Sequence, residues 1–132
     1  MNASSGAVEG GPRLILRSEG AALAIGAAFF YGRLDGPWLL FLVLFFAPDL
    51  SFLAYLVSPR IGAIVYNAMH STIGPLALFA LAGWAGVNGA KSIALIWLAH
   101  VGFDRALGYG LKYAIAFNAT HLGRIGRASG AL

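Results

Sequence analysis

The sequence contains no cysteine and few charged residues. Only 11% of its 132 residues are charged, whereas 59% are hydrophobic. The absence of cysteine excludes disulfide bonds, thiolate metal ligands and a cysteine nucleophile. Soluble domains carry about 25% charged residues, so the low charge excludes an ordinary water-facing surface. Because the length suits one domain, the composition indicates a single compact membrane domain.

The sequence also lacks any run of basic residues. Its net charge is +4, but the lysines and arginines are scattered near the ends of apolar segments. This distribution argues against nucleic acid as a partner and favours the lipid bilayer. The 18 glycines agree with this interpretation, because small residues let membrane helices approach closely.

Long apolar stretches predict an all-α integral membrane bundle of four transmembrane helices. We expect residues 1–12 to be a flexible N-terminal tail, residues 13–125 the transmembrane domain and residues 126–132 a C-terminal tail. About 20 apolar residues suffice to cross a bilayer, and Pro48 is expected to kink the second span. The expected helices cover residues of about 14–31, 38–57, 61–87 and 90–117.

Four spans would place both termini on the same side of the membrane, and the basic residues are unevenly divided between the two sides. The opposite side carries only Arg33 and Lys91. By the positive-inside rule, we expect a multi-pass protein of the cell inner membrane with cytoplasmic N- and C-termini. The basic residues on the cytoplasmic side are Arg13, Arg17, Arg60, Arg124 and Arg127.

Four ionisable residues lie inside the apolar stretches. A charge at the bilayer centre costs roughly 2.5–3.5 kcal/mol, so such residues usually face the interior of a helix bundle. Asp49 lies eleven positions before Arg60 and His70 lies ten positions after it, which places both at the same depth in two antiparallel helices. His100 and Asp104 are four residues apart and share one helix face. We therefore expect one cluster in the cytoplasmic half of the bundle.

Several other polar residues are expected to surround this cluster. Asn67 shares a helix face with His70, while Glu19 and Arg105 are expected to line the rim of the site. Residues at the cytoplasmic boundary can bind a lipid phosphate or simply extend toward the lipid headgroups. For this interface we expect Tyr109, Lys112 and His121.

Metal binding is the most specific chemistry that the four ionisable residues suggest. Two imidazoles and two carboxylates suit a divalent ion such as iron, zinc or manganese, and a bound metal could activate water with a carboxylate as base. However, their spacing matches no compact helical metal motif. The alternative is a direct network of Asp and His side chains that satisfies their buried polar atoms. The adjacent carboxylates disfavour haem between the two histidines.

Three classes of function remain open at this point. The preferred one is an intramembrane site for a metal ion or small polar ligand, and an enzyme is neither required nor excluded. The second is a non-catalytic accessory subunit of a larger membrane complex, which the small size and many glycines would suit. The weakest is a proton or ion carrier. Such a carrier needs polar residues through the whole thickness of the membrane, whereas the outer halves of the second and third spans are almost purely apolar.

Five short blocks together resemble a known family. They are LRSEG (16–20), PDLSFLAYL (48–56), RIGAIVYNAMH (60–70), HVGFDRALGYGLKYA (100–114) and THLG (120–123). The sequence resembles the bacterial integral membrane family catalogued as domain of unknown function 4260, over about residues 13–125. The resemblance implies a small helical membrane protein and carries no established activity. All four residues of the expected cluster fall within the blocks.

Overall fold

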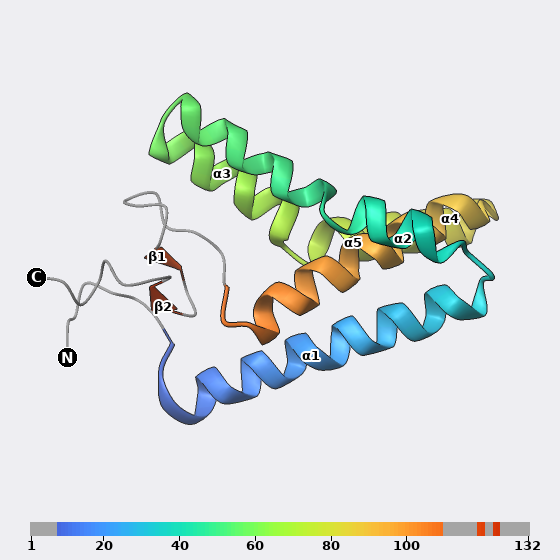
Figure 1. The fold of residues 1–132 in the computed structure, drawn as a ribbon, viewed down its shortest axis with the longest axis horizontal. Helices are drawn as coiled ribbons and strands as arrows, with labels where there is room; N and C mark the ends of the chain where they lie inside the picture. The colour runs from blue at the N-terminus through green and yellow to red at the C-terminus, as the bar shows by residue number, and fades with distance from the viewer. Residues whose placement is uncertain (1–7, 110–118, 121–122, 125–132) are drawn as a thin grey trace, which may run out of the picture.

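The computed structural model describes residues 8–109, 119–120 and 123–124 and shows a helical fold (Figure 1). Two very short strands, β1 (Ala119–Thr120) and β2 (Gly123–Arg124), pair in antiparallel fashion. The helices, in chain order, are α1 (Gly10–Arg33), α2 (Trp38–Phe45), the 3-10 helix η1 (Ala47–Leu56), α3 (Pro59–His70), α4 (Ile73–Ala85) and α5 (Asn88–Ala106).

Helices α1 and α5 lie side by side and run in opposite directions (Figure 1). They approach closely where Gly20 meets Gly102. A Cβ atom added to Gly20 would lie 2.8 Å from the Gly102 carbonyl oxygen, and one added to Gly102 would lie 2.6 Å from the Gly20 oxygen. Glycine at this crossing therefore brings the two backbones together, as is common in membrane helix pairs. Farther along the pair, a core forms from Ala27, Tyr31, Leu95, Ile96 and Ala99.

The second apolar stretch changes helix type near its middle. Helix α2 ends at Phe45, and the chain continues from Ala47 as a 3-10 helix of ten residues. Pro48 explains the change, because proline lacks an N–H and its ring clashes with the carbonyl four residues earlier in an α-helix. A 3-10 helix of this length is uncommon. It packs against α3, the next helix along the chain.

The third apolar stretch is two helices rather than the single helix expected over residues 61–87. Helices α3 and α4 form a pair bent by 41°. Ser71 leaves the helical conformation, with φ −79° and ψ 151°, and its Oγ accepts a hydrogen bond from the Ile73 N–H at 3.0 Å. Pro75 lies in the first turn of α4, where a missing N–H removes no intrahelical bond. The side chain of Ser71 thus binds the first N–H of α4, which begins shortly after His70.

The fourth helix ends earlier than the expected residue 117. Helix α5 ends at Ala106, and Gly108 has a φ of +93° that favours glycine. The Gly108 N–H donates to the Arg105 carbonyl and the Tyr109 N–H to the Asp104 carbonyl, at 3.0 and 2.8 Å. This pattern is a Schellman termination, which satisfies the last carbonyls of the helix. Residues 110–117 of the expected helix lie outside the described residues.

Two segments are long and apolar enough to cross a membrane, Gly10–Arg33 and Trp38–Leu56, and the bent α3–α4 pair gives a third if it is one broken span. Within the described residues, this is two or three candidate spans instead of the four expected. Helix α5 does not qualify, because Lys91, Asp104 and Arg105 make it too polar. It is instead well enclosed, with seven buried residues against three in the longer α1.

The apolar helices of this fold expose large hydrophobic side chains. Ile25 on α1, Leu39 on α2 and Leu53 on η1 are 71%, 72% and 64% exposed. An exposed apolar surface over whole helices is what a lipid bilayer requires. The length and apolar surface of these helices suit a membrane-embedded protein.

Candidate metal centre

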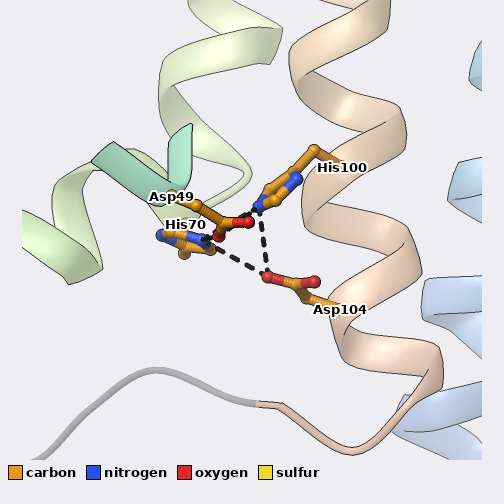
Figure 2. Close-up of side chains that lie close together, drawn as sticks. All are labelled: Asp49, His70, His100 and Asp104. Atoms are coloured by element: carbon orange, nitrogen blue, oxygen red, sulfur yellow. Dashed lines mark hydrogen bonds and ion pairs between the residues drawn. The ribbon is translucent and has the colours of Figure 1, made fainter. Parts of the chain in front are cut away.

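Four polar side chains from three segments point toward one another in Figure 2. Asp49 lies in the first turn of η1 and His70 is the last residue of α3, whereas His100 and Asp104 lie one turn apart on α5. Each residue offers one ligand atom, and these four atoms all lie within 4.8 Å of one another. The structure therefore brings together the four residues that the sequence places at similar depth.

The distances within this Asp/His cluster are short and similar. The Nε2 atom of His100 lies 3.2 Å from both Asp49 Oδ1 and Asp104 Oδ2. The Nε2 atom of His70 lies 3.4 and 3.3 Å from the same two oxygens, and the two Nε2 atoms are 3.0 Å apart. The side chains of His70 and His100 are only 4% and 2% exposed, against 15% for Asp104 and 38% for Asp49. The cluster is thus enclosed around the histidines and accessible beside Asp49.

This spacing is close to that of a tetrahedral metal site. For metal–ligand distances of about 2.0–2.1 Å, the corners of a regular tetrahedron lie about 3.3–3.4 Å apart. Five of the six distances between the four ligand atoms are 3.0–3.4 Å, and the remaining distance is within 4.8 Å. The donor set therefore fits a small divalent ion after modest side-chain movement.

The backbone of α3 orients the ring of His70. Its Nδ1 atom lies 3.0 Å from the Tyr66 carbonyl oxygen. A carbonyl can only accept, so Nδ1 donates, and a neutral His70 then turns the lone pair of Nε2 toward the cluster. Metal-bound histidines commonly donate their other ring nitrogen in this way. The ring of Tyr66 also stacks on that of His70, with centroids 3.8 Å apart and planes 8° apart.

Two side chains of α5 hold the end of α3. Trp97 Nε1 donates to the Met69 carbonyl at 2.6 Å, and Arg105 Nη2 donates to the His70 carbonyl at 3.3 Å. The last four carbonyls of a helix have no intrahelical partner, so these bonds compensate for the break after His70. Arg105, which the sequence predicts at the rim of the site, contacts the backbone of a cluster residue.

The remaining residues expected around the site have varied positions. Glu19 is exposed on α1 and lies outside the Asp/His cluster. Asn67 is half-buried on α3, and its carbonyl accepts the Ser71 N–H. Tyr109 is 40% exposed and serves through its N–H in the termination of α5. Lys112 and His121 lie outside the described residues, so their expected place at the lipid interface stays a prediction.

Sequence reasoning missed the residues that support the cluster. Tyr66 precedes His70 by four positions and Trp97 precedes His100 by three, so both share a helix face with a cluster histidine. That spacing could have identified Tyr66 as a neighbour of His70. No pattern identifies the bond from Trp97 to Met69, because it depends on the break between α3 and α4.

Comparison with known proteins gives one match. A family model described as "Domain of unknown function (DUF4260)" matches residues 13–125, which include all four cluster residues. No curated protein and no solved structure matches the chain. The description of the family names no activity, so a function has to be argued from the site.

Proposed function

The chain belongs to this family, and we propose that it is a membrane protein that binds a divalent metal ion through Asp49, His70, His100 and Asp104. The observation that carries the proposal is the convergence of four ligand atoms, from three segments, at nearly tetrahedral spacing. Two imidazole nitrogens and two carboxylate oxygens suit zinc, iron or manganese.

The direction of the His70 lone pair is compatible with a bound cation. With Nδ1 donating to the Tyr66 carbonyl, a neutral His70 has no proton on Nε2. That nitrogen then faces the carboxylates of Asp49 and Asp104 at 3.4 and 3.3 Å. Without a metal, the lone pair can accept a hydrogen bond only from His100 Nε2, 3.0 Å away, whereas the carboxylate oxygens offer no proton. One divalent ion would satisfy all four groups together.

The exposure of the ligands indicates the side from which a small molecule reaches the ion. A bound divalent ion supplies Lewis-acid activation of water or of a polar substrate. Asp49 is the most exposed ligand at 38%, so it lies on the accessible side. If the protein is an enzyme, Asp49 is the ligand that can give way to water and act as its base, because it is the most exposed of the four.

Metal content after purification tests this proposal. We expect about one zinc, iron or manganese ion per wild-type chain by elemental analysis, and none when His70→Ala and His100→Ala are combined. Glu19→Gln is a matched control, because this carboxylate is exposed and outside the cluster. It should leave the metal content unchanged.

A wild-type protein that holds no stoichiometric metal, even after incubation with zinc, iron(II) and manganese, would contradict the proposal. In that case, a double variant that unfolds at a lower temperature than both metal-free wild type and Glu19→Gln would indicate that the Asp/His cluster serves in helix packing.

We further propose that both ends of the chain face the cytoplasm of a cell with an inner membrane. Figure 1 places the start of α1 and the end of α5 at the same end of the structure, which carries Arg13 and Arg17. The positive-inside rule supports this orientation.

Because the chain has no cysteine, Ser58→Cys and Asp35→Cys give single labelling sites at opposite ends. In intact spheroplasts, an impermeant maleimide should label only the Asp35 variant, and the reverse result would invert the orientation.

A further inference from the structure

An apolar groove lies where α1, α4 and α5 come together, away from the Asp/His cluster. Its cavity volume is about 370 Å³, and its lining contains only apolar residues and glycine. Helix α5 contributes Leu95 and Leu98, α4 contributes Leu76 and Phe79, and the other lining residues come from the second half of α1. Helix α5 packs against both of the other helices.

This α1–α4–α5 groove opens on the outer surface of the helices. Phe30 of α1 and Leu76 of α4 line it and are 58% and 50% exposed. Helix α1 is long and apolar enough to cross a membrane, and α4 belongs to the bent pair that gives a further candidate span. The groove therefore faces the hydrocarbon layer, where an acyl chain or another apolar helix has to fill it.

The packing of α1 against α5 fixes which residues of the two helices lie at the same level. Gly20 meets Gly102 at the close crossing. Ala27 lies seven residues after Gly20, Leu95 lies seven residues before Gly102, and both belong to the same core. The two antiparallel helices thus keep one register along this length.

That register places Lys91 at one end of the groove. Four more residues along each helix bring Lys91 level with Tyr31, which directly follows the lining residue Phe30. Lys91 also lies four residues before Leu95 and seven before Leu98, a spacing that puts all three on one face of α5. The half-buried Lys91 is therefore on the face that lines the groove, one turn beyond it.

Arg33 lies at the same end of the groove on α1. It follows the lining residues Gly26 and Phe30 by seven and three positions, so it shares their helix face. It is two residues beyond Tyr31, the residue level with Lys91, which is about 3 Å along the axis. The last turn of α1 and the first turn of α5 thus bring two cations to one end of an apolar groove.

These two cations have no anion beside them among the described residues. Neither side chain forms an ion pair or a hydrogen bond there, and the exposed Asp35 pairs with neither. Lys91 also lies in the first turn of α5, which holds no acidic residue and where the helix dipole disfavours a cation. A bound anion at this place would offset both charges.

We propose that the α1–α4–α5 groove binds an anionic phospholipid, with one acyl chain along Leu95 and Leu98 and the phosphate between Lys91 and Arg33. The two cations favour a lipid over an apolar helix as occupant, because a phosphate carries negative charge and lies at the membrane surface above its acyl chain. This lipid site is on the side opposite the chain termini and does not depend on a metal ion.

Native mass spectrometry of the full chain tests the head group. The protein is titrated in a neutral detergent with phosphatidylglycerol and with phosphatidylcholine that carry identical oleoyl chains. We expect wild type to bind phosphatidylglycerol about ten-fold more tightly, and this preference should disappear when Arg33→Gln and Lys91→Gln are combined. Arg60→Gln is the control, because this exposed arginine begins α3 outside the groove. It should keep the preference.

Two glycines give a matched test of the acyl chain. A Cβ atom added to Gly26 or to Gly83 meets nothing within 4 Å, and both residues lie within helices. Gly26 lines the groove, whereas Gly83 is exposed on α4 outside the lining. Gly26→Leu should therefore weaken the binding of both lipids about ten-fold, and Gly83→Leu should leave it unchanged. Ala22→Leu fills the same groove one turn earlier and should act as Gly26→Leu does.

Three results would overturn the proposal. Equal affinity of wild type for the two lipids would remove the phosphate site between Lys91 and Arg33. Unchanged binding in Gly26→Leu and Ala22→Leu would show that no acyl chain occupies the groove. A wild-type dimer that Gly26→Leu dissociates, while Gly83→Leu does not, would show that a second copy of the chain fills it.

Discussion

His100 and Asp104 come from a regular helix, whereas Asp49 and His70 come from places where helices break. On α5, the four-residue spacing alone aligns the two side chains, and the close contact with α1 at Gly102 supports them. Asp49 instead follows Pro48 at the start of η1, and His70 ends α3 before the 41° bend.

This difference shows how a small bundle can surround one point with ligands. A single helix face presents side chains from one direction only. The break after His70 and the change of helix type at Pro48 bring in ligands from other directions, and these places need support from outside their own segments. Trp97 and Arg105 supply it by binding the two carbonyls at the end of α3.

The two carboxylates allow the largest test of this comparison. Asp104→Asn and Asp49→Asn each remove a charge with little change of size. We expect metal affinity to fall about 100-fold for Asp104→Asn and about ten-fold for Asp49→Asn. Asp104 is 15% exposed and Asp49 is 38% exposed, so water can more readily replace the oxygen lost from Asp49.

Competition with a chelator of known affinity measures both values on protein in the same detergent, with Glu19→Gln as the reference carboxylate variant. If the two variants lose affinity equally, or if Asp49→Asn loses more, the regular and the broken part of the site do not differ in the way proposed.

A smaller effect is expected when the break at η1 is removed. Pro48→Ala restores an N–H and relieves the clash that prevents α2 from continuing. An α-helical path would rotate Asp49 away from the cluster, so metal affinity should fall about five-fold while the helical signal in circular dichroism is retained. Pro59→Ala is the matched control, because Pro59 occupies the first position of α3, where proline suits the helix.

Unchanged affinity in Pro48→Ala would show that the position of Asp49 does not depend on η1. A similar fall in Pro48→Ala and Pro59→Ala would point to a general loss of packing rather than to rotation of one ligand.

The cluster itself could be predicted from the sequence for a simple physical reason. Charged groups are costly in an apolar stretch, which makes Asp49 and His70 conspicuous there. Counting from the Arg60 turn gives their equal depth, and the spacing of His100 and Asp104 gives a common face. The structure agrees on this convergence. The role of the cluster as a metal site stays a proposal.

The breaks in the helices were harder to foresee. Ser71 and Thr72 lie between two apolar segments, and two small polar residues are compatible with a continuous membrane helix. The bend is accompanied by the hydrogen bond that the Ile73 N–H donates to Ser71 Oγ and by the bonds that α5 donates to the freed carbonyls. Such tertiary contacts override local preference.

The early end of α5 was also hard to predict, because Gly108 is only one of 18 glycines in the sequence. Glycine is frequent within membrane helices, so its presence alone does not indicate an end. The expected count of four spans also depended on α5. Its many apolar residues suggest a membrane span, but Lys91, Asp104 and Arg105 make the helix too polar to face lipid.

The 3-10 conformation of η1 also lengthens the segment to which it belongs. A 3-10 helix rises about 2.0 Å per residue against about 1.5 Å for an α-helix. Trp38–Leu56, with its 19 residues, therefore extends over roughly 33 Å instead of roughly 28 Å. The hydrocarbon layer of a typical bilayer is about 30 Å thick. The 3-10 turns beside Asp49 thus give this segment the length to span the layer without local thinning of the bilayer.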